Sequence, residues 1–174
     1  MAAVDVRNRL QPALLDRLTD DSPGDRLEAE DHRVMSKAQL RQAVLRDLGA
    51  LFNAVQPLGA AADAYPLLGD SVLNFGLPPL SGQLASKLDI GTLEGAIRQA
   101  IVRFEPRILP DTLEVRALES TSVLDTHNVV EFEIRGHLWS QPVPLEILLR
   151  TQLDLEAGQV EVRDAAGVVP SKVR

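Results

Sequence analysis

Hydrophobic positions change their spacing along this chain. Up to Phe104 they recur every three or four residues, a spacing that places apolar side chains along one side of a helix. Beyond Pro110 they recur every second residue, which places them on one face of a strand. The pattern therefore predicts helices followed by a run of strands, an order that is typical of an α+β domain.

The clearest helical pattern covers residues 92–104. Either Asp89 or Thr92 is suited to cap this helix. Glu94 and Arg98 have the i,i+4 spacing of a helical ion pair and are expected to face solvent, opposite the apolar stripe. That stripe consists of Leu93, Ala96, Ile97, Ala100, Ile101 and Phe104.

Pro106 ends this helix, because proline disfavours the helical conformation of the residue before it and has no N–H to donate. Glu105 and Arg107 therefore flank a fixed bend. One interpretation is an exposed ion pair at a helix end, which contributes about 0–1 kcal/mol. The other is a pair of charges offered to a partner protein, where burial makes each charge matter more.

A second helix is predicted from residue 37 to about residue 55. Ser36 and Gln39 have the spacing of a capping box, which marks its start. Gly49 lies inside the helix at a cost of about 1 kcal/mol relative to alanine, so we expect a close contact there. The apolar face consists of Leu40, Val44, Leu48, Leu51, Phe52 and Val55.

Alternating apolar and polar residues predict four strands near 113–117, 130–138, 147–155 and 160–163. The fold class is therefore α+β. A small antiparallel or mixed sheet of about four strands is covered on one face by two main helices, with a flexible N-terminal segment. The expected divisions of the chain are an N-terminal extension (1–35), a single domain (36–164) and a C-terminal tail (165–174).

Composition narrows the classes of function. The net charge of −7, with 25 acidic and 18 basic residues, disfavours nucleic acid and anionic membranes as partners. The absence of cysteine excludes disulfides and thiolate sites. No signal peptide or transmembrane-length apolar run is evident, so we expect a cytoplasmic protein without membrane insertion.

No enzyme constellation stands out. His32, His127 and His137 lack metal-ligand spacing, and no phosphate-binding glycine loop is present. Glu105 resembles a general acid at a helix end, but the sequence places no second carboxylate across a cleft from it, and Arg107 is close enough to keep it ionised. We therefore predict no catalytic residue, no cofactor and no metal.

Two apolar segments are candidate contacts with a partner. Near the N-terminus, Leu14, Leu15 and Leu18 form a short helical or extended anchor that is a candidate contact with another protein. Residues 70–82 place large apolar side chains among turn formers, so this loop is expected to be pinned to the core or to a partner. Its central residues are Asn74, Phe75, Gly76, Leu77 and Pro78.

The chain resembles the TssE family, which forms part of the baseplate of the bacterial type VI secretion system. The resemblance rests on residues 71–82, the helix end Phe104-Glu105-Pro106-Arg107, residues 132–139, Pro144 and residues 151–155. The family is related to the sheath-initiating baseplate wedge protein of contractile phage tails. The resemblance extends from about residue 10 to residue 164. Some relatives carry a lysozyme label, which the residues here do not support.

The resemblance implies a structural subunit that joins the baseplate wedge and initiates polymerisation of the contractile sheath, through strand exchange with the first sheath subunits. The implied partners are TssF, TssG and TssK in the baseplate and TssB and TssC in the sheath. The family's motif falls on Glu105, Pro106 and Arg107, which are implied to bind partners. The alternatives are a peptidoglycan hydrolase and a sheath initiator of a related phage-tail-like particle.

Overall fold

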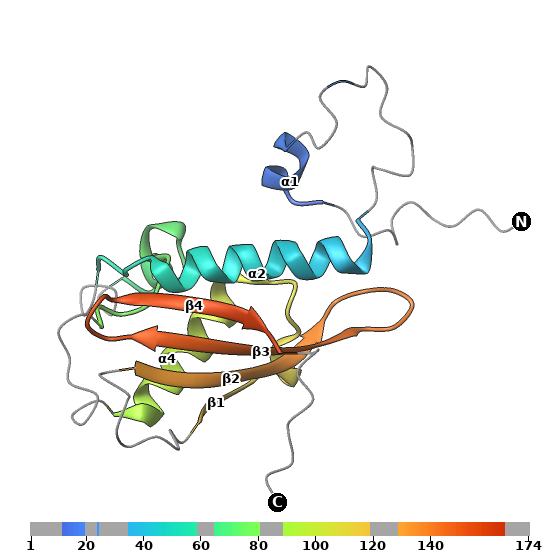
Figure 1. Ribbon diagram of the computed structural model, residues 1–174. Coiled ribbons are helices and arrows are strands. Elements are labelled where there is room, and N and C mark those ends of the chain that lie inside the picture. Colours follow the sequence, from blue (N-terminus) through green and yellow to red (C-terminus); the bar gives the residue numbers. More distant parts are fainter. Residues whose placement is uncertain are drawn as a thin grey trace, which may run out of the picture.

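A computed structural model describes residues 12–19, 24, 35–58, 65–80, 89–118 and 129–165. Helices precede strands, as the change in the spacing of hydrophobic residues predicts (Figure 1). The elements are α1 (Leu14–Leu18), α2 (Lys37–Asn53), α3 (Pro66–Gly69), the 3-10 helix η4 (Val72–Asn74), α4 (Ile90–Phe104), the 3-10 helix η6 (Pro110–Thr112), β1 (Glu114–Leu118), β2 (Val129–Leu138), β3 (Leu145–Asp154) and β4 (Gln159–Asp164).

Helix α2 begins with the predicted capping box. The Ser36 hydroxyl accepts a hydrogen bond from the Gln39 N–H at 3.2 Å, and the Gln39 side chain accepts one from the Ser36 N–H at 2.9 Å. The helix ends at Asn53, so Val55 lies beyond it and is 61% exposed instead of continuing the apolar face. The buried residues of α2 are Leu40, Ala43, Val44, Leu48, Leu51 and Phe52.

Helix α4 is capped by Asp89, whose carboxylate accepts hydrogen bonds from the Gly91 N–H at 3.1 Å and from the Thr92 hydroxyl. The hydroxyl bond is the largest of the effects that lower the pKa of Asp89. The predicted apolar stripe is confirmed at its centre, where the buried residues are Leu93, Ile97, Ala100 and Ile101.

Two local expectations for the helices are wrong. Glu94 and Arg98 do not pair with each other across the helix surface. Glu94 accepts a hydrogen bond from the Ala117 N–H of β1 at 2.6 Å, and Arg98 donates to the Pro110 carbonyl at 3.4 Å. Tertiary contacts thus replace the helical pair. No close packing requires glycine at position 49 either, because a Cβ atom added there would meet nothing within 4 Å.

The sheet has four antiparallel strands in the order β1-β2-β3-β4, which confirms the predicted α+β class. Helices α2 and α4 bury one face of it (Figure 1). The apolar strand residues facing these helices alternate as predicted, and the fully buried ones include Phe132, Ile134, Leu138, Ile147 and Leu149. Gly158 in the β3–β4 turn has the expected positive φ, 65°.

The opposite face of the sheet, called the open face below, is polar. Three strands carry a Glu-x-Arg pair whose side chains bridge along the strand: Glu114 and Arg116, Glu133 and Arg135, and Glu161 and Arg163. The sheet is therefore covered on one face, with two edge strands, β1 and β4.

Some predictions concern residues outside the described ranges. They include His32 and His127, most of the N-terminal extension and the C-terminal tail beyond Ala165. Ala165 itself is buried, and its N–H donates to the Leu148 carbonyl at 2.8 Å, so the β4 pairing continues to the first residue of the predicted tail.

Candidate functional site

The triplet Glu105-Pro106-Arg107 forms a turn that is bonded to both layers of the fold. The Glu105 N–H donates to the Ile101 carbonyl at 2.8 Å and so ends α4. The Arg107 carbonyl accepts a hydrogen bond from the Trp139 N–H, also at 2.8 Å, which ties the turn to the end of β2. Backbone contacts therefore fix the direction in which the triplet's side chains leave the chain.

Glu105 and Arg107 form an ion pair with two points of contact. Arg107 donates from Nε to one carboxylate oxygen at 2.6 Å and from a terminal nitrogen to the other at 2.5 Å. The Glu105 side chain is 4% exposed and that of Arg107 is 24% exposed. The predicted role of Arg107 as a counter-ion is thus confirmed, but the pair is largely buried and not an exposed pair at a helix end.

A chain of alternating charges continues from this pair onto the N-terminal helices. Arg107 also contacts Asp47 of α2 at 2.5 Å. Asp47 bridges to Arg46 at 2.9 Å, and Arg46 bridges to Asp16 of α1 at 2.6 Å. Residues from α1, α2 and the α4–β junction are therefore joined by one ionic chain, which runs from the buried Glu105 through the partly exposed Arg107, Asp47 and Arg46 to Asp16.

The ionic chain raises the pKa of both arginines. Burial alone would lower the pKa of Arg107, but the hydrogen bonds and charges of Glu105 and Asp47 outweigh it and hold that pKa above its ordinary value. For Arg46 the hydrogen bond to Asp16 has the largest effect on the pKa, and Asp47 adds to it. Both side chains therefore keep their positive charge and act as fixed cations in the site.

The three members of the triplet differ in what they offer to a partner. Glu105 is buried and already holds Arg107, while Pro106 is exposed and Arg107 is partly exposed. A partner that approaches this turn meets Pro106 and the outer part of the Arg107 guanidinium. Partner binding by the triplet remains a prediction, and the geometry assigns Glu105 the role of positioning Arg107.

The short helix α1 presents its leucines to solvent. Leu14 and Leu18 are each 74% exposed and Leu15 is 55% exposed. Helix α1 is held beside α2 by the bridge between Asp16 and Arg46 (Figure 1). Packing inside the chain does not account for these exposed leucines, and their binding to a partner remains a prediction.

The loop that contains Asn74, Phe75, Gly76, Leu77 and Pro78 is pinned to the end of α2. The Leu77 N–H donates to the Ala54 carbonyl at 2.9 Å, and its carbonyl accepts from the Gln56 N–H at 2.8 Å.

The backbone conformation at position 76 requires glycine. Its φ is +127°, and a Cβ atom there would lie 2.4 Å from the Ala54 carbonyl oxygen. Asn74, Gly76 and Leu77 are buried, and Phe75 packs edge-on against Phe104 with ring centroids 5.3 Å apart. Attachment to the core therefore explains Phe75 and Leu77, whereas Val72 and Leu73 of the same segment are 81% and 65% exposed. The predicted contact of this loop with a partner remains untested.

Sequence reasoning missed Asp47, Asn53 and Glu94 as parts of the site. Asp47 completes the ionic chain, and Asn53 and Glu94 bind backbone groups of the edge strands. All of these contacts join residues far apart in the sequence, so no local spacing could reveal them.

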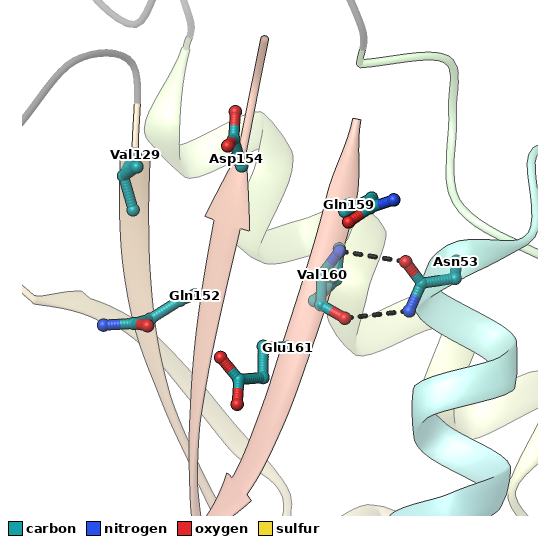
Figure 2. A pocket seen from close by; sticks show the side chains of 7 residues that line it. All are labelled: Asn53, Val129, Gln152, Asp154, Gln159, Val160 and Glu161. Carbon is teal, nitrogen blue, oxygen red and sulfur yellow. Dashed lines mark hydrogen bonds between the residues drawn. The ribbon is translucent and has the colours of Figure 1, made fainter. Parts of the chain in front are cut away.

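A shallow polar depression lies on the open face of the sheet near the β3–β4 turn (Figure 2). It is lined by Asn53, Val129, Gln152, Asp154, Gln159, Val160 and Glu161. Within the described ranges, no three His, Asp or Glu side chains are grouped so that they could hold a metal ion.

Comparison with known proteins identifies the class. Residues 38–143 match the family model described as baseplate wedge protein gp25. The chain belongs to this family and is a structural baseplate component of contractile tail-like systems, in which it contacts other baseplate components. The matched region includes the triplet and the loop around Gly76. No curated protein and no solved structure matches the chain.

Among the described residues, no helix is long and apolar enough to cross a membrane.

Proposed function

We propose that this chain is a TssE-type subunit of a cytoplasmic type VI secretion baseplate, where it joins the wedge and initiates the contractile sheath. Membership of the baseplate wedge family supports the structural role. The type VI assignment rests on the resemblance of residues 71–82, the triplet and residues 132–139 to TssE. The proposed partners are TssF, TssG and TssK in the wedge and TssB and TssC in the sheath.

The observation that carries the sheath role is the small antiparallel sheet with two edge strands. An edge strand presents backbone N–H and C=O groups that can pair with an extended segment of another chain. Such pairing could start a polymer whose next subunits add in the same way. The chain acts in this proposal as a template and not as a catalyst.

The arrangement of Glu105 supports a role without catalysis. A glycosidase of the usual kind needs a protonated general acid and a second carboxylate across the cleft. Here both carboxylate oxygens of Glu105 are bound by Arg107 and the side chain is only 4% exposed, so the carboxylate is not presented to a substrate. Purified protein is expected to leave cell-wall suspensions turbid; clearing that is lost in Glu105→Gln would support the hydrolase instead.

The experiment that tests the proposal is complementation in cells that lack this chain and carry a fluorescent sheath subunit. Restoring the chain should restore dynamic sheaths, and the purified chain should recover TssF and TssG. Sheaths that form equally well without the chain would contradict its role in initiation. If the purified chain recovered sheath subunits but not TssF and TssG, that result would contradict the chain's place in the wedge.

A further inference from the structure

The edge of β4 is occupied by a side chain of α2. The Asn53 amide accepts a hydrogen bond from the Val160 N–H at 2.9 Å and donates one to the Val160 carbonyl at 2.8 Å (Figure 2). In an antiparallel sheet, both backbone groups of alternate residues point away from the neighbouring strand. Asn53 therefore fills the place that the next strand would take.

The other end of β4 is also held by α2. Arg41 bridges to Asp164 at 2.9 Å and donates to the Glu146 carbonyl at 2.7 Å. Helix α2 runs beside β4 between these two contacts (Figure 1). The backbone groups of Val162, between these two contacts, also point away from β3. A strand that paired with Val162 would have to displace Asn53 or Arg41 to extend in either direction. The edge of β4 is therefore closed.

The edge of β1 is more open. The Ala117 N–H donates to the Glu94 carboxylate at 2.6 Å, which shows that the backbone N–H and carbonyl of Ala117 point away from β2. By the same alternation, the backbone N–H and carbonyl of Val115 also point away from β2. Three backbone groups of β1 have no hydrogen-bond partner in the described part of the chain: the N–H and the carbonyl of Val115 and the carbonyl of Ala117. The contact with Glu94 is a single acceptor that a carbonyl of an incoming strand could replace.

We propose that β1 is the edge that receives an extended segment of the first sheath subunits and that α2 closes β4 against it. This inference rests on the proposed function and sharpens it by naming the edge. The two sides of β1 define the chemistry of the segment. Val115 and Ala117 face the helix layer and are half-buried, whereas Glu114 and Arg116 lie on the open face. A fitting segment alternates apolar residues with charged residues of complementary sign.

Two matched proline variants separate the edges. Val115→Pro and Val162→Pro each remove an outward N–H from an edge strand, and neither residue donates to its neighbouring strand, so proline is tolerable at both positions. Each variant is co-expressed with TssB and TssC, and the sheath protein that co-purifies is measured. We expect Val115→Pro to lower recovery at least tenfold and Val162→Pro to preserve it, with cooperative thermal unfolding in both.

The other outcomes overturn the inference in distinguishable ways. Loss of recovery with Val162→Pro alone would place the segment on β4 and leave the proposed function intact. Loss with both folded variants would contradict a closed β4. Full recovery with both would contradict strand addition itself, and with it this part of the proposed function.

Amide hydrogen exchange on the unmodified protein provides a second measurement if a proline variant does not fold. In complex with TssB and TssC, exchange at Val115 should slow at least tenfold, while exchange at Val162 should stay unchanged. The reverse pattern would assign the segment to β4, and unchanged exchange at both would exclude an added strand. Protection of Val115 that grows with concentration of the isolated chain would instead identify a second copy as the occupant.

Discussion

Replacing Glu105 by glutamine tests whether this residue acts inside the subunit or on a partner. Removing one member of a buried ion pair costs about 3–5 kcal/mol, because the remaining charge is left without its partner. Arg107 keeps its contact with Asp47 and is 24% exposed, and glutamine still offers one acceptor oxygen. We therefore expect Glu105→Gln to lower the free energy of unfolding by about 2–3 kcal/mol.

The assay is thermal unfolding followed by circular dichroism. For a chain of this length, about 1 kcal/mol shifts Tm by roughly 2–4 °C, so a loss of about 2–3 kcal/mol lowers Tm by roughly 4–12 °C. Glu161→Gln is the matched control, because it removes the same charge from an exposed pair with Arg163 and should leave Tm unchanged. A Glu105→Gln protein with the parent's Tm that no longer supports sheath assembly would refute the reasoning and assign Glu105 to a partner contact.

Three further substitutions test other parts of the account. Gly76→Ala should cost at least about 2 kcal/mol, since φ is +127° and the new Cβ would meet the Ala54 carbonyl; a parent-like urea midpoint would contradict that geometry. Leu48→Ala should cost about 2–5 kcal/mol by the same measurement, because Leu48 is fully buried, and a loss below about 1 kcal/mol would mean that α2 packs less tightly than described. Serine at all three leucines of α1 should leave Tm unchanged but reduce the TssF and TssG that co-purify; undiminished recovery would remove α1 from the wedge contact.

Local sequence patterns were sufficient to predict the two main helices and the four strands, but not the short helices α3, η4 and η6. The apolar spacing located α2, α4 and all four strands, and the capping box at Ser36 marked the start of α2 to the residue. Pro106 correctly predicted the end of α4. These features depend on neighbours within a few residues, so a single sequence contains the information that determines them.

The electrostatic site could not be predicted in the same way. The sequence suggested Arg107 as a counter-ion for Glu105, but the burial of the pair depends on α2 and β2, which lie far away along the chain. The same holds for Glu94, whose expected helical partner Arg98 is replaced by the backbone of β1. Where a side chain is within reach of a distant backbone or charged group, tertiary contact outweighs a helical pair that contributes only about 0.2–0.5 kcal/mol.

The closed edge of β4 shows a related limit. Asn53 is an unremarkable polar residue at the end of a helix until the fold brings it beside Val160, where its amide pairs with both backbone groups. The sequence predicted a sheet with edges, but which edge is free depends on how α2 lies against it. That distinction now gives the proposed sheath contact a specific location.

The most direct test of the central claim is a cryo-electron microscopy structure of the junction between baseplate and sheath that contains this chain. The account predicts an extended segment of a sheath subunit hydrogen-bonded to the edge of this sheet, alongside Val115. A first sheath ring that contacts the chain through the helices or the open face alone, with both sheet edges unpaired, would contradict it.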